Sequence, residues 1–234
     1  MERPCEDRGS KSVLPALVIL ARHPEAGNVK TRLAASIGDA AATALYRTFL
    51  LDLGRKLAAH PAWVLYWAFA PADSPLPAEV AGREKAFAQA DGDLGERMAN
   101  AIERVLGDGH PSVVLIGSDI PHVSIVTIED AFGRLSAGAP LVLGPAEDGG
   151  YYLVGATSLP PVFRSIRWGS SSVLSETIAA ARRAGIEPAL VAPDYDIDDE
   201  EDLERLRAEI RAGRITDLQA TGAELERAPG LRYR

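Results

Sequence analysis

Cysteine is nearly absent from this chain of 234 residues, which contains only Cys5. A single thiol cannot form a disulfide within the chain, and zinc sites built from several cysteines are excluded. We expect Cys5 to be a terminal residue without a function. Long hydrophobic runs are also missing. The longest, near residues 13–21, is far short of the ~20 residues of a membrane-spanning helix. No signal-peptide cleavage site follows it, so we expect a cytoplasmic protein.

A surplus of positive charge is missing as well. The chain has 25 Lys and Arg against 33 Asp and Glu, a formal net charge of −8. Nucleic-acid binders usually carry a basic stripe that releases counterions from the phosphate backbone. We therefore expect no nucleic acid and no membrane span among the partners. A small phosphorylated ligand needs only a local group of donors, and no oligomeric state is indicated.

Apolar runs of strand length alternate with helical patterns along the chain. Strands are predicted at 16–21, 64–70, 85–89, 112–117, 140–144, 151–156 and 188–192, and helices at 39–60, 95–106, 124–137, 172–185 and 198–213. This alternation predicts a three-layer, Rossmann-like α/β fold with a mostly parallel mixed sheet. The short AEDGG turn predicts one antiparallel pair. We expect a flexible leader at 1–13, one domain at 14–213 and a tail at 214–234.

Polar segments follow several of the predicted strands. In such sheets, ligands bind beyond the carboxyl ends of the strands. After the first strand come Arg22, Gly27, Lys30 and Arg32. The bases can hold phosphates, and Gly27 allows the backbone to approach a ligand closely. The alternative is a solvated basic loop. A Walker A loop is excluded because GxxxxGK[ST] is absent.

Carboxylates follow two other strands. Asp119 comes directly after a buried strand and is a natural ligand for Mg²⁺, which prefers oxygen. It can equally form a turn or helix cap before Pro121. Asp198 can supply a second carboxylate or cap the following helix, and Asp194 and Asp196 compete with it for the metal.

Further candidates lie on other loops. Asp148, followed by two glycines, suits either a tight hairpin turn or a carboxylate that acts in catalysis or binds an acceptor. Trp168 can stack on a base or sugar, although core packing is the usual role of tryptophan. The loop before the helix at 95–106 can contact a nucleotide, or it can be an ordinary helix start, through Gln89, Gly92, Gly95 and Arg97.

Six segments together resemble a known family. They are LVILARHPEAGNVKTRL, QADGDLGERM, LIGSDIPHV, LGPAEDGGYYLVG, IRWGSSSVLSETI and DYDIDDEEDL. In this order they are similar to a bacterial family of glycosyltransferase-like proteins with the GT-A fold, of the type called DUF2064. That family belongs to the nucleotide-diphospho-sugar transferase superfamily and is related to small nucleotidyltransferases. The resemblance covers roughly residues 14–212.

The resemblance implies roles for matching residues. It makes Lys30 and Arg32 phosphate contacts, and it makes Asp119 and Asp198 ligands of a divalent cation, Mg²⁺ or Mn²⁺. It also places residues 148–151, which are Asp148, Gly149, Gly150 and Tyr151, near the transferred group or the acceptor. The chain departs from the pattern with Arg22, where lysine is usual, and with DIDD, where D-[IV]-D-T is usual.

Three functions follow as hypotheses. The first is glycosyl transfer from a nucleotide-diphospho-sugar to a small acceptor. The second is nucleotidyl transfer from a nucleoside triphosphate to a phosphorylated or acidic acceptor, with release of pyrophosphate. A lone Asp119 in place of D-x-D favours the second, and the breadth of the resemblance favours the first. The third, a non-catalytic nucleotide-binding protein, predicts the loss of a site residue, whereas all of the main candidates are present.

Overall fold

The strands form one mixed sheet in the order β3-β2-β1-β4-β6-β5-β7. The computed structural model describes residues 13–74, 77–80 and 85–227, so Cys5 and all of the expected leader except Val13 lie outside the described residues. The strands are β1 Ala16–Arg22, β2 Val64–Ala70, β3 Lys85–Ala88, β4 Val113–Gly117, β5 Leu141–Pro145, β6 Tyr151–Ala156 and β7 Ala189–Leu190. The helices are α1 Thr31–Ile37, α2 Asp39–Ala58, α3 Leu94–Gly107, α4 Ile125–Ser136, α5 Val173–Arg183, α6 Glu200–Arg211 and α7 Gln219–Arg227.

The pairing confirms the predicted fold class. β1 runs parallel to β2 and β4, β2 to β3, and β5 to β7. β6 runs antiparallel to both β4 and β5. The expected antiparallel pair across the AEDGG turn is therefore β5–β6, and β6 is the one reversed strand of the sheet among the described residues.

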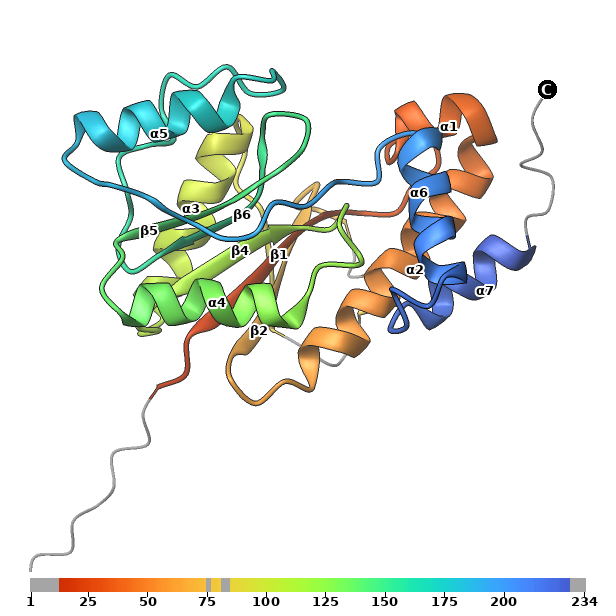
Figure 1. The fold of residues 1–234 in the computed structure, drawn as a ribbon, viewed down its shortest axis with the longest axis horizontal. Coiled ribbons are helices and arrows are strands. Elements are labelled where there is room, and N and C mark those ends of the chain that lie inside the picture. The colour runs from red at the N-terminus through yellow and green to blue at the C-terminus, as the bar shows by residue number, and fades with distance from the viewer. Residues whose placement is uncertain (1–12, 75–76, 81–84, 228–234) are drawn as a thin grey trace, which may run out of the picture.

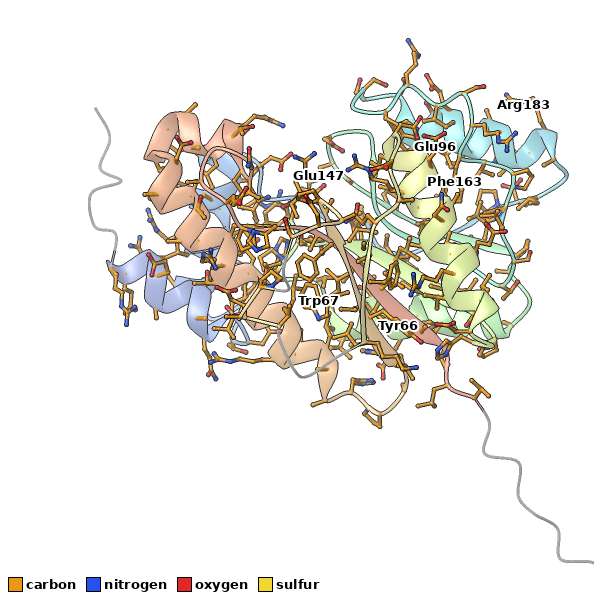
Figure 2. All side chains as sticks on the ribbon, turned by 180° about the vertical axis from the view of Figure 1, so that it is seen from behind. Tyr66, Trp67, Glu96, Glu147, Phe163 and Arg183 are labelled. Atoms are coloured by element: carbon orange, nitrogen blue, oxygen red, sulfur yellow. The ribbon has the colours of Figure 1, made fainter. Side chains whose placement is uncertain are left out.

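Helices cover both faces of the sheet. Leu17 and Ile19 of β1 pack on one face with α1, α2, α4, α6 and α7, whereas the alternate residue Val18 packs on the other face with α3 and α5 (Figure 1). Tyr66 and Trp67 follow each other on β2 and belong to opposite faces, and Figure 2 shows them pointing to different sides. Alternating side chains that are buried on both faces explain why the central strands read as continuous apolar runs.

Three elements differ from the sequence prediction. The short helix α1 was not predicted. β7 has two residues instead of the expected five. Within the expected tail, residues 219–227 form α7, whose Leu225 joins the core beside α2. Asp52 of α2 accepts hydrogen bonds of 3.0 and 2.8 Å from the backbone of Ala220 and Thr221, so a distant side chain caps this helix.

Within the described residues, none of the helices combines the length and the apolar character needed to cross a membrane.

Candidate functional site

The sheet reverses its direction of growth beside β1. The chain runs from β1 to β2 and β3 on one side, then crosses back to β4 on the other side of β1. Such a switch opens a crevice at the carboxyl ends of the two central strands. A cavity of about 570 Å³ lies there, so the polar loops expected on one rim do meet. Its lining includes Arg22, Lys30, Arg32, Gln89, Gly92, Arg97, Asp119 and Asp198.

Lys30 has its ammonium group between the two predicted metal ligands. Its Nζ lies 2.5 Å from Asp119 Oδ1 and 3.5 Å from Asp198 Oδ1. It also donates a 2.6 Å hydrogen bond to the carbonyl oxygen of Ile197. The side chain is only 3% exposed, and the backbone has φ 50° and ψ 42°, a left-handed conformation that is uncommon for residues other than glycine. Lys30, which the sequence predicts to contact phosphate, therefore pairs with two carboxylates in this structure.

The helix-cap interpretations of Asp119 and Asp198 are wrong. Ser124 caps α4 and Asp199 caps α6. The Asp119 and Asp198 side chains are partly exposed, at 43% and 38%. The backbone N–H of Ile197 donates a 2.9 Å hydrogen bond to the carbonyl oxygen of Asp119. This bond holds the two carboxylate-bearing loops side by side.

The two competing aspartates have different surroundings. Asp194 Oδ1 lies 3.0 Å from His122 Nε2, away from the cavity lining. Asp196 is largely buried, and burial together with the negative charges of Asp119 and Asp198 raises its pKa to about 7. Burial also raises the pKa of Asp198, although the nearby Lys30 ammonium opposes this. Negative charge is thus concentrated beside the cavity.

Tyr46 of α2 also lines the cavity, and sequence reasoning missed it. Its hydroxyl oxygen lies 2.8 Å from Ser118 Oγ and accepts a 3.0 Å hydrogen bond from the backbone N–H of Arg22. Burial raises its pKa well above the ordinary value, so the hydroxyl stays neutral. It ties the end of β1 to the end of β4. The helical spacing of α2 indicated only a core residue at this position.

The loop before α3 forms another wall of the cavity. Gln89 Nε2 donates hydrogen bonds of 2.9 and 2.7 Å to the carbonyl oxygens of Ala21 and Ala68. Both amide protons are used, so the orientation of the amide is fixed. Arg97 Nε donates a 3.1 Å hydrogen bond to the carbonyl oxygen of Gly92. This wall can contact a nucleoside, as the sequence predicts.

Gly95 and Trp168 pack against each other instead of lining the cavity. A Cβ atom on Gly95 would lie 2.5 Å from the carbonyl oxygen of Phe163 and 2.6 Å from the Trp168 ring. The Trp168 ring also meets the ring of Tyr151 edge-on, with centroids 6.3 Å apart. Gly95 is therefore required for close packing of α3, and the two aromatic rings are partly buried and pack against the core cluster on this face of the sheet.

Asp148 lies in a smaller hollow beside the cavity. This hollow of about 200 Å³ shares Arg32 and Asp198 with the main cavity. The Arg32 guanidinium pairs with Asp198 at 3.3 Å and with Asp199 at 3.1 Å. Asp148 is therefore next to the bases and carboxylates of the site, where a second substrate can enter.

Three glycines that the sequence places at the site have roles in backbone conformation and packing. The N–H of Gly150 donates a 2.8 Å hydrogen bond to Asp148 Oδ1, which is the tight-turn role expected for this carboxylate. Gly149 has φ 91°, and a Cβ atom there would lie 2.1 Å from the carbonyl oxygen of Ser171. Gly27 has φ 82° with open space around it, and it lies outside the cavity lining.

The donor set fits a divalent cation. Oxygens of Asp119 and Asp198 converge on one point, which Lys30 Nζ marks. In the part of the chain that the structure describes, no three His, Cys, Asp or Glu side chains gather into a metal-binding group. Mg²⁺ is often held by one or two carboxylates together with substrate phosphates. Two carboxylate ligands from the protein are sufficient if the phosphates of a bound substrate supply further ligands.

The fold matches that of a solved structure provisionally named a nucleotide-diphospho-sugar transferase. The family described as uncharacterized proteins conserved in bacteria (DUF2064) matches residues 50–170, and the chain belongs to this family. The resemblance seen in the sequence is thereby confirmed. Among curated proteins, none matches the chain.

Solved structures extend the comparison. A protein from Desulfovibrio desulfuricans G20, provisionally named a nucleotide-diphospho-sugar transferase, is 34% identical with a TM-score of 0.84, covering 93% of this chain and 96% of its own. A 4-diphosphocytidyl-2C-methyl-D-erythritol synthase is 12% identical with a TM-score of 0.54, covering 86% and 100%. A cytidylyltransferase from Leptospira borgpetersenii serovar Hardjo-bovis is 13% identical with a TM-score of 0.55, covering 95% and 100%. The last two share the fold alone.

Proposed function

We propose that this protein is a metal-dependent glycosyltransferase that uses a nucleotide-diphospho-sugar as donor and a small molecule as acceptor. The observation that carries the proposal is that Arg22, Lys30 and Arg32 meet the carboxylates of Asp119 and Asp198 in one cavity at the sheet's switch point. The relative at 34% identity, named as a nucleotide-diphospho-sugar transferase, supports the choice of donor.

The bases bind the diphosphate in this proposal. Arg22 and Arg32 open onto the cavity, and guanidinium groups match phosphate oxygens with paired hydrogen bonds. Their positive charge stabilises the nucleoside diphosphate as the bond to the sugar breaks. Gln89 and Arg97 contact the nucleoside. Asp119 and Asp198 would hold Mg²⁺ or Mn²⁺, which would supply further neutralisation of phosphate charge.

The acceptor binds on the Asp148 side. The smaller hollow adjoins the cavity through Arg32 and Asp198, so an acceptor there faces the sugar of a donor in the cavity. Asp148 Oδ1 is used in the turn. The second carboxylate oxygen, Oδ2, takes the proton of the acceptor hydroxyl while the hydroxyl oxygen of the acceptor attacks the sugar.

Nucleotidyl transfer is the second candidate, because Asp119 is followed by Ile120 and Pro121 in place of a D-x-D motif. In this reaction an acceptor oxygen attacks the α-phosphorus of a nucleoside triphosphate. The bond from the α-phosphorus to the bridging oxygen breaks, and pyrophosphate leaves. The same bases would stabilise the leaving group.

Thermal unfolding with a ligand panel tests the proposal. Purified protein is melted with nucleotide-diphospho-sugars and nucleoside triphosphates, with and without Mg²⁺. A ligand at a hundred times its Kd stabilises by about 2.7 kcal/mol. We expect Mg²⁺-dependent stabilisation by one nucleotide-diphospho-sugar, and release of a nucleoside diphosphate when acceptors are added. Stabilisation by a triphosphate alone, with pyrophosphate release, would select the second candidate.

A further inference from the structure

Lys30 occupies the point where the two metal-binding carboxylates converge. Its Nζ contacts Asp119 Oδ1, Asp198 Oδ1 and the carbonyl oxygen of Ile197 at 2.5, 3.5 and 2.6 Å. An ammonium group has three donors and no lone pair, so it cannot serve as a metal ligand. A divalent cation bound to both carboxylates would need the same space and would lie beside a like charge. Lys30 and the metal are therefore competitors.

Lys30 provides the main positive charge that compensates the Asp119 and Asp198 carboxylates. In the described part of the chain, the other base paired with Asp119 or Asp198 is Arg32, which contacts Asp198 at 3.3 Å. The Arg32 side chain is 66% exposed, and its guanidinium also pairs with Asp199. Asp196 and Asp198 also line the same smaller hollow. Without Lys30 the site would hold several carboxylates against one exposed base, which is the condition that favours a divalent cation.

The cavity offers the Lys30 ammonium group a second position. Lys30 is among the residues that line the 570 Å³ cavity, together with Arg22 and Arg32. Lysine carries its charge on a flexible four-carbon stem, so the ammonium can turn towards phosphates without a movement of the backbone. Phosphate oxygens offer it charge-assisted hydrogen bonds that replace those it leaves. The left-handed backbone at φ 50° is a conformation that surrounding structure must hold, as is common at functional sites.

We propose that Lys30 is a built-in counter-ion that closes the Asp119–Asp198 site and gives it up when a divalent cation enters. The inference rests on the proposed function, because the displaced ammonium then binds the donor phosphates. It predicts that metal alone binds weakly and that metal and nucleotide bind cooperatively, since phosphates stabilise Lys30 in its second position. By linkage, each ligand raises the affinity for the other by the same factor.

Binding of Mn²⁺ alone tests this. Free Mn²⁺ is followed by electron paramagnetic resonance during titration of the wild type, Lys30→Met and the control Lys85→Met, which removes a lysine bonded to the Tyr66 hydroxyl. We expect Lys30→Met to bind Mn²⁺ about tenfold more tightly than the wild type, within the usual range for coupled sites. Asp119→Asn added to Lys30→Met should abolish the gain. Equal or weaker binding by Lys30→Met would overturn the proposal.

A measurement on the wild type covers the case in which Lys30→Met fails to fold. An amine-acetylating reagent is applied with and without saturating Mn²⁺, and each lysine is quantified by mass spectrometry. Lys30 labelling should rise with Mn²⁺, whereas Lys56, equally buried at 3% exposure, should not change. Unchanged Lys30 labelling would contradict displacement. Neither experiment contains a nucleotide, so failure of the donor assay and failure of this inference are distinguishable.

Discussion

Gly149→Ala tests the packing that places the Asp148 turn. Gly149 has φ 91°, and its Cβ atom would lie 2.1 Å from the carbonyl oxygen of Ser171. Gly109 has nearly the same φ, 93°, with nothing within 4 Å of its Cβ position. Both substitutions introduce a side chain in the left-handed region, at about 1–2 kcal/mol. Only Gly149→Ala adds a clash with backbone, which costs about 1–3 kcal/mol more.

Thermal unfolding of the two variants separates these contributions. In a chain of this size, 1 kcal/mol corresponds to about 2–4 °C in Tm. We therefore expect Gly149→Ala to melt about 2–12 °C below Gly109→Ala. Because the backbone must shift, it should also weaken any activity that depends on Asp148. If the two variants melted at the same temperature, the close approach between this turn and the segment before α5 would be refuted.

Three further predictions concern single side chains. Tyr46→Phe leaves the Ser118 hydroxyl without its hydrogen-bond partner on α2, so urea unfolding should show a loss of about 1–3 kcal/mol; no loss would contradict its tying role. Asp199→Ala removes the cap of α6 and should cost about 0.5–2 kcal/mol in the same assay. Hydrogen bonds from the Arg167 backbone and side chain and from Ser172 lower the pKa of Glu176 to about 2. The stability from this contact is therefore present above the ordinary pKa and lost as the pH falls towards 2. Glu176→Gln should reduce this loss of stability at acid pH. An unchanged loss would refute the assignment.

Much of the fold could be predicted because the central strands are buried on both faces. The predicted bounds of β2 and β6 are those of the structure, since a continuous apolar run of this length is typical of a strand covered on both sides. α1 was missed because it has only seven residues. α7 was missed because its stability depends on Asp52, which is far away in the sequence.

The site could be predicted only in outline. Strand ends identified the rim, because parallel strands bring their carboxyl ends together. The actual partners depend on chain crossings that no local pattern reports. Lys30 meets Asp198 across 168 positions, and Tyr46 meets Ser118 across 72. Gly95 looked like part of a nucleotide loop, but the approach of Trp168 accounts for it.

Isothermal titration with a nucleotide-diphospho-sugar panel, with and without Mg²⁺, tests the central claim most directly. We predict that one donor binds the wild type in the presence of Mg²⁺, that Arg32→Ala weakens this binding, and that Asp119→Asn removes its dependence on Mg²⁺. Lys85→Met, at the first residue of β3 and outside the cavity lining, should bind as the wild type does. If every nucleotide failed to bind the folded protein, or if a donor bound equally well to the Arg32 and Asp119 variants, the cavity would not be a nucleotide site.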